Sequence, residues 1–309
     1  MQVVVKQSSG LGNQLFQYAA GRCLARRHGA SLRVAHQLPH VLTSYGHTRS
    51  VLLQRFAISA PVRQVSWFDR LVSTDREELQ SAARAARALF RVQMIRQAPE
   101  RSLFRQELRV QPGIRSVYLK GFWQDAAIVR EVEGDLRREL TLVDPLRGRN
   151  LETANRIASA RNPVSIHLRR GDYGSFFGDN MILPTAYYEH AIAHMLERNR
   201  RSTFFVFTDD VAFAKEWLRG DPRFVVVDQN DDESAHEDLR LMSLCRHHII
   251  ANSTFSWWGA WLDPRCDKQV IAPARWLGFD TPMTALACPD WTLLDAEMPR
   301  RILPRAVGA

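Results

Sequence analysis

The stretch VSIHLRRGDY, residues 164–173, predicts a β-strand that ends in charged side chains. Apolar residues at positions 164, 166 and 168 alternate with polar ones, which is the two-residue period of a strand. His167 and Arg169 lie on the polar side of this strand, and Arg170 and Asp172 come directly after it. Ligands bind at the carboxyl ends of strands in open α/β sheets, and paired guanidinium groups match the oxygens of a phosphate. We therefore expect a phosphate-binding site at this strand end.

The second half of the chain alternates apolar strands with helical segments, which predicts a parallel sheet wound through right-handed crossovers. Strands are expected at residues 164–169, 203–208, 224–227, 248–251 and 269–272. The first four run into the polar clusters RRGD, TDD, DQNDD and NSTFS. Because the carboxyl ends of parallel strands meet at one edge of a sheet, these clusters indicate one site along that edge.

The first half of the chain begins as a strand, a glycine loop and a helix. Residues 3–5 predict a buried strand, the loop contains Gly10 and Gly12, and residues 13–28 predict a helix. The motif GLGNQL differs from GxGxxG, so it gives little support for a dinucleotide site.

The length of 309 residues allows two domains. Asp144-Pro145, followed by the polar segment 147–150, is the best candidate for a linker. We therefore expect one domain over residues 1–150 and a second over residues 151–309.

Residues 74–97 predict one long helix with five arginines, at positions 76, 84, 87, 91 and 96. A basic amphipathic helix can bind a membrane surface. The interpretation favoured here is a helix that packs its apolar side, with Leu79, Ala83, Ala86, Leu89 and Phe90, against the core and exposes its arginines to water.

The net charge of +9 and the pI near 9.9 favour anionic partners: a nucleotide-linked substrate, an acidic membrane surface or nucleic acid. A generally basic, solvated surface explains the charge equally well. The four cysteines form no CxxC pair, so we expect reduced thiols in a cytoplasmic protein. No apolar run approaches the roughly 18 residues of a membrane span, and the first residues do not resemble a signal peptide.

The arginine cluster has two interpretations. The arginines can pair structurally with Asp172 or a neighbouring helix, with Arg170 turned back to hold Asp172. The favoured alternative is a cationic clamp on a diphosphate leaving group, because a preorganised cation stabilises the charge that develops there.

Two further clusters carry similar alternatives. Asn252 or Ser253 can cap the helix that follows, either as an ordinary cap or as part of an anion site at the helix start. Asp209 and Asp210 can bind a metal, hydrogen-bond a ribose or guanine, or cap the next helix. A metal site usually needs a third ligand and none is obvious, so the nucleoside role is favoured.

Three segments together resemble the α-1,2-fucosyltransferases of glycosyltransferase family 11. They are GLGNQLFQYAAGR at 10–22, HLRRGDY at 167–173 and ANSTFSWWGAWL at 251–262. FTDD at 207–210 also fits, and the order and spacing agree over most of the chain. The pattern HxRRxD is shared with α-1,6- and O-fucosyltransferases, so the resemblance depends on the whole set.

The resemblance implies an α/β fold of the GT-B type, with two Rossmann-like halves of mainly parallel sheet facing a cleft. It implies transfer of L-fucose from GDP-L-fucose to the 2-hydroxyl of a galactoside, with inversion and without a metal or other cofactor. The acceptor would be a galactose-containing glycan made for the cell surface or for lipopolysaccharide. A lipid-linked acceptor would place the enzyme at the inner membrane face, where its positive charge permits contact with an anionic membrane.

The same resemblance assigns roles to individual residues. Arg169 would contact the diphosphate, with His167 and Arg170 beside it, and Asp209 or Asp210 would meet the guanine or ribose. Phosphate contacts are implied for Asn252, Ser253, Thr254, Phe255 and Ser256, and contacts with fucose and acceptor for Gly12, Asn13 and Gln14.

The general base has several candidates. Asp172 is the first choice and His167 the second, with Asp179 as a third. In a further alternative no protein group acts, and the departing phosphate takes the proton.

Other functions compete with this one. A transferase of the same fold could use another GDP-sugar or make another linkage. A nucleic-acid-binding protein would need a basic stripe with interleaved aromatics, whereas the arginines here are scattered, so no nucleic-acid partner is expected. A non-catalytic glycan-binding module would not need the phosphate clamp.

Overall fold

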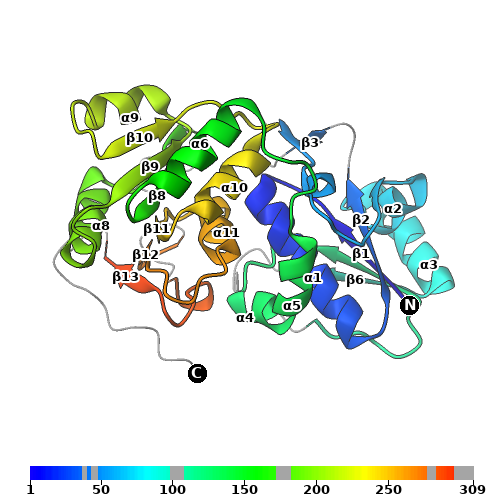
Figure 1. The fold of residues 1–309 in the computed structure, drawn as a ribbon. Helices are drawn as coiled ribbons and strands as arrows, with labels where there is room; N and C mark the ends of the chain where they lie inside the picture. Colours follow the sequence, from blue (N-terminus) through cyan, green and yellow to red (C-terminus); the bar gives the residue numbers. More distant parts are fainter. Residues whose placement is uncertain (37–39, 43–47, 98–107, 172–181, 277–282, 296–309) are drawn as a thin grey trace. The chain divides into compact units, whose positions relative to one another are not determined.

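The computed structural model describes residues 1–309 except 37–39, 43–47, 98–107, 172–181, 277–282 and 296–309 (Figure 1). The chain divides into two compact units, Met1–Val143 and Asp144–Ala309. The expected boundary after residue 150 falls instead inside helix α6 (Gly148–Ser159), so the segment 147–150 begins a helix and is not a linker.

The first unit contains a five-stranded parallel sheet in the order β5-β2-β1-β7-β6. Its strands are β1 (Gln2–Lys6), β2 (Ser31–His36), β5 (Val62–Gln64), β6 (Val92–Arg96) and β7 (Ser116–Lys120). Its helices are α1 (Leu11–Arg27), α2 (Trp67–Val72), α3 (Gln80–Phe90), α4 (Ala126–Glu131) and α5 (Glu133–Glu139), with short 3₁₀ turns at Leu53–Arg55 and Glu77–Leu79. Strands β3 (His40–Leu42) and β4 (Thr48–Ser50) form a separate antiparallel pair.

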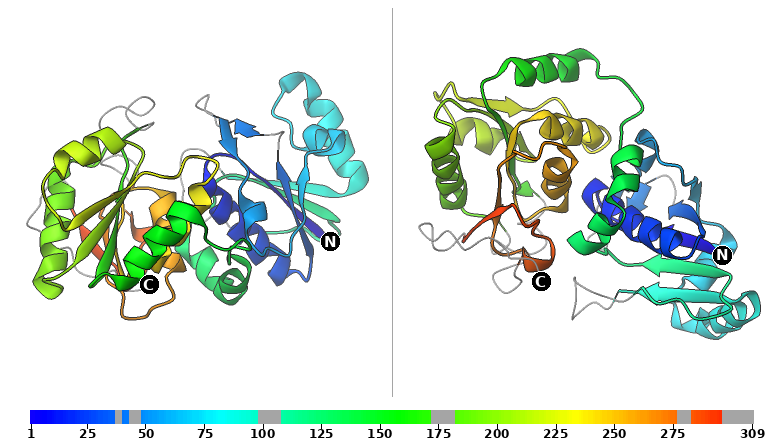
Figure 2. Two further views of the ribbon diagram at one scale, coloured as in Figure 1. Left: turned by 45° about the horizontal axis from the view of Figure 1, so that its top comes forward. Right: turned by 60° about the horizontal axis from the view of Figure 1, so that its bottom comes forward.

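β1 lies at the centre of the first sheet, and both faces of the sheet are covered there. Val3, Val4 and Val5 are fully buried, which matches the continuous apolar run of an internal parallel strand. Val4 packs towards α2 and α3, whereas Val5 contacts α1 at Gly21. Helices therefore lie on both faces of this sheet (Figure 2). A Cβ on Gly21 would lie 2.2 Å from Val5 Cγ2 and 2.8 Å from Leu32 Cδ1, so α1 approaches the sheet as closely as only glycine permits.

The second unit contains a six-stranded parallel sheet in the order β10-β9-β8-β11-β12-β13. Its strands are β8 (Pro163–Leu168), β9 (Thr203–Thr208), β10 (Phe224–Val227), β11 (His247–Ile249), β12 (Val270–Pro273) and β13 (Thr292–Leu294). Its helices are α6, α8 (Thr185–Arg198), α9 (Val211–Trp217), α10 (Ala235–Leu244) and α11 (Thr254–Leu262), with a 3₁₀ turn at Met283–Ala285.

Strand β8 occupies the centre of this sheet, between β9 and β11. Val164, Ile166 and Leu168 pack with α8 on one face, as the alternating pattern predicts. On the neighbouring strand β9, Phe205 and Phe207 pack in a second cluster against α6 and α10. Both faces of the sheet are therefore buried, and its ligands must enter at an edge or a strand end.

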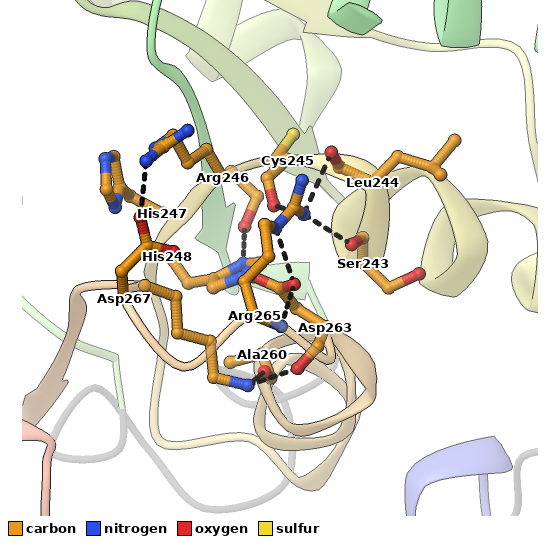
Figure 3. Close-up of polar contacts among 12 residues, drawn as sticks. Ser243, Leu244, Cys245, Arg246, His247, His248, Ala260, Asp263, Arg265 and Asp267 are labelled. Atoms are coloured by element: carbon orange, nitrogen blue, oxygen red, sulfur yellow. Dashed lines mark hydrogen bonds and ion pairs between the residues drawn. The ribbon is translucent and has the colours of Figure 1, made fainter. Parts of the chain in front are cut away.

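A buried polar network fixes the end of α11 against β11 (Figure 3). Asp263, which is fully buried, accepts hydrogen bonds from His248 Nε2 at 3.0 Å and from Arg265 Nε at 2.7 Å. The other ring nitrogen of His248 meets Ser165 Oγ on β8 at 2.8 Å, and Arg265 also donates to the carbonyls of Ser243 and Leu244. Burial opposes ionisation of Asp263, but these donors hold its pKa below the usual range.

Several predicted elements differ from the observed ones. The segment 74–97 forms a 3₁₀ turn, α3 and strand β6, because Arg91 takes a left-handed conformation (φ 53°) that ends the helix. Of the side chains expected on the packed face, only Ala83 is fully buried, and Leu89 is 77% exposed. Helix α1 begins at Leu11 and not at residue 13, and strands β2, β5 and β13 were not predicted.

In the described part of the chain, every helix is too short or too polar to cross a bilayer. The four cysteines are free thiols, with Cys23 and Cys245 buried.

Replacing Gly21 with alanine is expected to destabilise the protein by about 1–3 kcal/mol, because the added methyl overlaps Val5 and Leu32. Gly134→Ala in α5 is the matched control, since the nearest side-chain atom would lie 3.8 Å from its Cβ. The free energy of unfolding in urea measures both. Equal unfolding midpoints for Gly21→Ala and the wild type would contradict the packing described here.

Candidate functional site

The strand order of the second sheet creates a binding position at the carboxyl ends of β8 and β11. The chain runs from β8 outward through β9 to β10, and then returns to β11 on the other side of β8 before it continues outward. Loops after the two central strands therefore leave in opposite directions, and in folds of this kind ligands bind in the crevice between such loops. RRG follows β8 and NS follows β11, so both predicted clusters flank this position.

Two contacts between side chains bring three strand ends together. Arg169 Nη1 after β8 lies 2.9 Å from Asp209 Oδ2 after β9. The ring of His167 on β8 lies 5.6 Å from the ring of Phe255 at the start of α11, which follows β11. The structure thus assembles residues from the RRGD, TDD and NSTFS segments at one edge, as the sequence predicts.

Asp209 organises the loop after β8. Its carboxylate accepts the ion pair from Arg169 and a hydrogen bond from the backbone N–H of Arg170 at 2.8 Å. Burial opposes its ionisation, but the Arg169 charge and the backbone donors hold its pKa below the usual value. A Cβ on Gly171 would lie 2.9 Å from Asp209 Oδ2, so the loop wraps the carboxylate closely.

Arg170 points to a partner that the sequence did not suggest. Its guanidinium lies over the ring of Phe213 on α9, 3.7 Å from the ring centre, and its Nε is 3.5 Å from Asp210 Oδ2. Asp210 also caps α9 by accepting from the N–H of Phe213 at 3.1 Å. The expected contact of Arg170 with Asp172 lies outside the described residues.

His167 is a buried, neutral imidazole. Burial, followed by the nearby charge of Arg169, lowers the pKa of His167 to about 3. Its Nδ1 has no hydrogen-bond partner among the residues that the structure describes. A base with so low a pKa holds a transferred proton poorly, so this geometry suits His167 as a neutral hydrogen-bonding group.

The NSTFS segment provides the start of α11. Ser253 caps the helix by accepting from the N–H of Phe255 at 3.3 Å, so Thr254 and Phe255 begin the first turn at the crevice. Ser256 is only 2% exposed, and its hydroxyl accepts from Ala251 N and donates to Ser253 O. Its hydroxyl therefore holds the loop, while Asn252 beside it is buried at 5% exposure.

The glycine loop of the first unit leads into α1 with two of the predicted contact residues, Gln14 and Gly12. Gln14 is fully buried, donates to the carbonyls of Ser9 and Ser50, and accepts from the N–H of Leu52. It holds the loop together, and its predicted contact with a substrate stays a prediction. Gly12 is likewise buried in the first turn of α1.

Asn13 keeps the role of a candidate contact, with a partner that sequence reasoning missed. Gln124, after β7, donates to Asn13 Oδ1 at 2.8 Å. Strands β1 and β7 are neighbours in the first sheet, and Ser9 and Trp123 in the following loops both have positive φ, at 67° and 56°. Such strain is frequent at functional sites. The polar residues after the strand at 116–120 were the available signal for Gln124.

No group of three potential metal ligands exists among the described residues. Asp209 and Asp210 both accept from protein donors, as described above. The predicted contact of either carboxylate with a nucleoside stays a prediction.

Comparison with known proteins identifies the family. Residues 102–293 match Glycosyl transferase family 11. The O-antigen biosynthesis glycosyltransferase WbnK of Escherichia coli is 31% identical over 298 residues, covering 87% of this chain and 93% of that protein. This chain belongs to glycosyltransferase family 11. The resemblance that the motifs suggested is therefore confirmed.

Two further proteins place this family 11 transferase among relatives and folds. An alpha-1,2-colitosyltransferase of Escherichia coli is 28% identical over 313 residues, covering 95% of this chain and 99% of its own. The crystal structure of NodZ alpha-1,6-fucosyltransferase soaked with GDP-fucose is 16% identical, covers 85% of this chain and 92% of its own, and has a TM-score of 0.50. The expected α/β fold of the GT-B type with mainly parallel sheets is confirmed.

The His167 ring is expected to stay neutral between pH 5 and 8, because its folded pKa is about 3. Imidazole ¹⁵N NMR spectra, with His167→Gln for assignment, measure this directly. Since an unfolded ring binds a proton below its ordinary pKa of 6.5, His167 also makes the fold less stable as the pH falls from 6.5 towards 3. A titration midpoint of the His167 ring above pH 6 would show that the ring is not buried as described.

Proposed function

We propose that this glycosyltransferase moves L-fucose from GDP-L-fucose to the 2-hydroxyl of a galactoside, with inversion, in the synthesis of a cell-surface glycan or lipopolysaccharide. The observation that carries the proposal is the Arg169–Asp209 pair, which joins the carboxyl ends of β8 and β9. The pair fixes a guanidinium at the same sheet edge at which α11 begins, and a diphosphate bound there would meet both a cation and the positive end of a helix.

The chemistry asks for charge stabilisation at the leaving group. The acceptor oxygen forms a bond to the anomeric carbon while the bond from that carbon to the β-phosphate oxygen of GDP breaks, and the electron pair passes to the diphosphate. A cation that is already fixed by Asp209 stabilises that charge without reorganising. Arg170, held over Phe213, adds a second positive charge to the same loop.

The acceptor proton needs a destination. Asp172 is the proposed base, and Asp179 is the second candidate. Both lie outside the described residues. His167 is a weaker choice than the sequence suggests, because its pKa of about 3 makes it a poor proton acceptor near neutral pH.

A second donor deserves an assay because one relative is named an alpha-1,2-colitosyltransferase and is similar over nearly the whole chain. We propose fucose first, on the combined motifs, and a GDP-linked 3,6-dideoxy sugar such as colitose as the alternative. Turnover of GDP-fucose, GDP-colitose, GDP-mannose and UDP-sugars on a panel of galactosides, with the product linkage determined by NMR, separates these possibilities.

Arg169→Ala is expected to lower kcat with GDP-fucose by about 10²–10³-fold, because the departing diphosphate loses its fixed cation. Arg219→Ala is the matched control, since Arg219 lies exposed on the surface with Glu216 as its partner. Melting temperatures show that both variants fold. Wild-type turnover by a folded Arg169→Ala variant would exclude the proposed role.

We further propose that transfer needs no metal, because both carboxylates after β9 already accept from Arg169, Arg170 and backbone donors. In the same assay, EDTA is expected to leave turnover unchanged. Strict dependence on Mn²⁺ or Mg²⁺ would require Asp209 and Asp210 to be released from these partners.

We also propose that this enzyme is cytoplasmic and docks on the inner membrane face through α2 and α3. Trp67 and Leu89 are 75% and 77% exposed, and Phe90 is 52% exposed. Phe68 joins them, with ring centres 5.8 Å from Trp67 and 5.1 Å from Phe90. We call Trp67, Leu89 and Phe90 the apolar patch.

Charge around the apolar patch favours an anionic bilayer as its partner. Helix α3 carries Arg84 and Arg87 and no acidic side chain, and the exposed Arg91 follows its last residue. Exposed aromatic and aliphatic groups on and beside a basic helix suit the interface of a membrane that contains anionic lipids.

The double variant Trp67→Ser/Leu89→Ser is expected to bind vesicles that contain phosphatidylglycerol at least tenfold more weakly than the wild type. Val143→Ser, at an exposed apolar residue outside α2 and α3, is the control that should bind normally. Co-sedimentation with anionic and with neutral vesicles measures the partition. Equal binding by the double variant and the wild type would disprove docking through the patch, as would a patch that only mediates self-association in sedimentation velocity.

A further inference from the structure

Three cationic side chains stand side by side at the carboxyl edge of the first sheet. Lys6, Lys120 and Arg96 are the last residues of β1, β7 and β6, which are adjacent strands. Arg96 is the register partner of Lys120, and Val5 is the partner of Leu119, one residue before Lys6 and Lys120. Register partners in a parallel sheet project to the same face, with strands about 4.8 Å apart. We call these three residues the cation row.

Within the described residues, the three charges of the cation row are balanced by fewer carboxylates than cations. Asp75 is its one close carboxylate among the described residues, and it is shared between Arg96, at 3.1 Å, and Lys120. Asp69 lies nearby but is occupied by Arg33, Tyr118 and Ser66. Lys6 has no ion pair or side-chain hydrogen bond within the part of the chain that is described, and Arg70 on α2 adds a further positive charge beside it.

The crowding of like charges has a measurable consequence. Burial lowers the pKa of Lys6, and the charges of Arg96 and Arg70 lower it further, while Asp69 opposes them. Burial and the charge of Lys6 likewise lower the pKa of Lys120. Partly buried like charges at a sheet edge destabilise the folded chain, and binding of an anion would remove this repulsion.

The position and span of the row indicate what kind of anion fits. It lies at the carboxyl edge of the same sheet whose glycine loop presents Asn13, and ligands bind at such edges. Three strands at the usual spacing place the outer two cations about 10 Å apart at the backbone. Several oxygens spread over a phosphate or diphosphate can engage such a row, whereas a single carboxylate can meet only one or two of its members.

We propose that the cation row binds a phosphate or diphosphate group carried by the acceptor, separately from the diphosphate of the sugar donor. This inference rests on the proposed function in naming the acceptor a phosphate-bearing glycan, such as a lipid-diphosphate-linked one. Binding of the anion does not depend on which sugar is transferred.

The decisive measurement is calorimetric titration of inorganic pyrophosphate into the full chain saturated with GDP, so that the donor site is occupied. The wild type is expected to bind, and Lys6→Gln/Lys120→Gln to bind at least tenfold more weakly. Lys215→Gln, a lysine paired with Asp228 in the second unit, is the matched control and should bind as the wild type does. The single variant Lys6→Arg should retain most of the wild-type affinity for pyrophosphate, because it keeps the positive charge.

Two further readouts exclude a merely structural effect. The affinity for GDP should be the same in the wild type and the double variant, and pyrophosphate should raise the apparent pKa of Lys6 in side-chain NMR spectra. Affinity for pyrophosphate should fall as pH rises through the pKa values of Lys6 and Lys120, because both ammonium groups then lose their charge. The other charged groups beside them are Asp69, Asp75, Arg70 and Arg96.

Four outcomes would overturn the inference. They are no binding of pyrophosphate, equal binding by the double variant, a parallel loss of GDP affinity in the double variant, or a site that binds the carboxylate sugar galacturonate but does not bind pyrophosphate. Once transfer is measured, a phosphorylated galactoside should show a lower KM than its neutral counterpart in the wild type only. If no GDP-sugar is turned over while pyrophosphate still binds the row, the proposed function fails and the anion site stands.

Discussion

The central position of β8 in the second sheet is the constraint on which the candidate site depends. β8 is paired on both sides, with β9 and with β11, and its side chains are buried on both faces. The polar side chains within the strand, Ser165 and His167, are buried, and the charged Arg169 and Arg170 come only after its carboxyl end. The reversal of strand order on either side of β8 opens a crevice at that same end. One topological fact thus decides both where charge can gather and where a ligand has room.

Electrostatics at this strand end are arranged around one carboxylate. Asp209 holds the guanidinium of Arg169 and the backbone of Arg170, and its own ionisation is maintained by those donors. Burial, together with the charge of Arg169, keeps His167 neutral by lowering its pKa. A fixed cation beside a neutral imidazole suits recognition of a phosphate better than proton transfer by the histidine. The buried network around Asp263 holds the strands of this site in place, because it links β8, β11 and the end of α11.

The two units use similar sheets for different tasks. In the first unit, the carboxyl edge carries amides that bind one another, Asn13 and Gln124, and on the other face a row of cations with one shared carboxylate. In the second unit, the equivalent edge carries a fully organised ion pair and a helix start. A preorganised pair is typical of a site where charge changes during a reaction. A row of cations with too few carboxylates to balance its charge is typical of a site that binds an anionic ligand.

The sequence alone determined the second unit well. Alternation at residues 164–169 placed apolar and polar faces correctly, and polar clusters after successive strands located the site, because both signals are local and depend on the strand period. It also identified the family, since three motifs in fixed order carry more information than any one of them. The helix at 74–97 was wrong because a left-handed residue at Arg91, which no local pattern marks, converts its end into β6. Only tertiary structure decided that Gln14 is buried and hydrogen-bonded to a distant loop, and that Arg170 stacks on Phe213. It also decided that the cations Lys6, Lys120 and Arg96 lie side by side on adjacent strands. Each of these depends on which distant segments become neighbours, and strand order, unlike strand period, is not written in any short stretch of sequence.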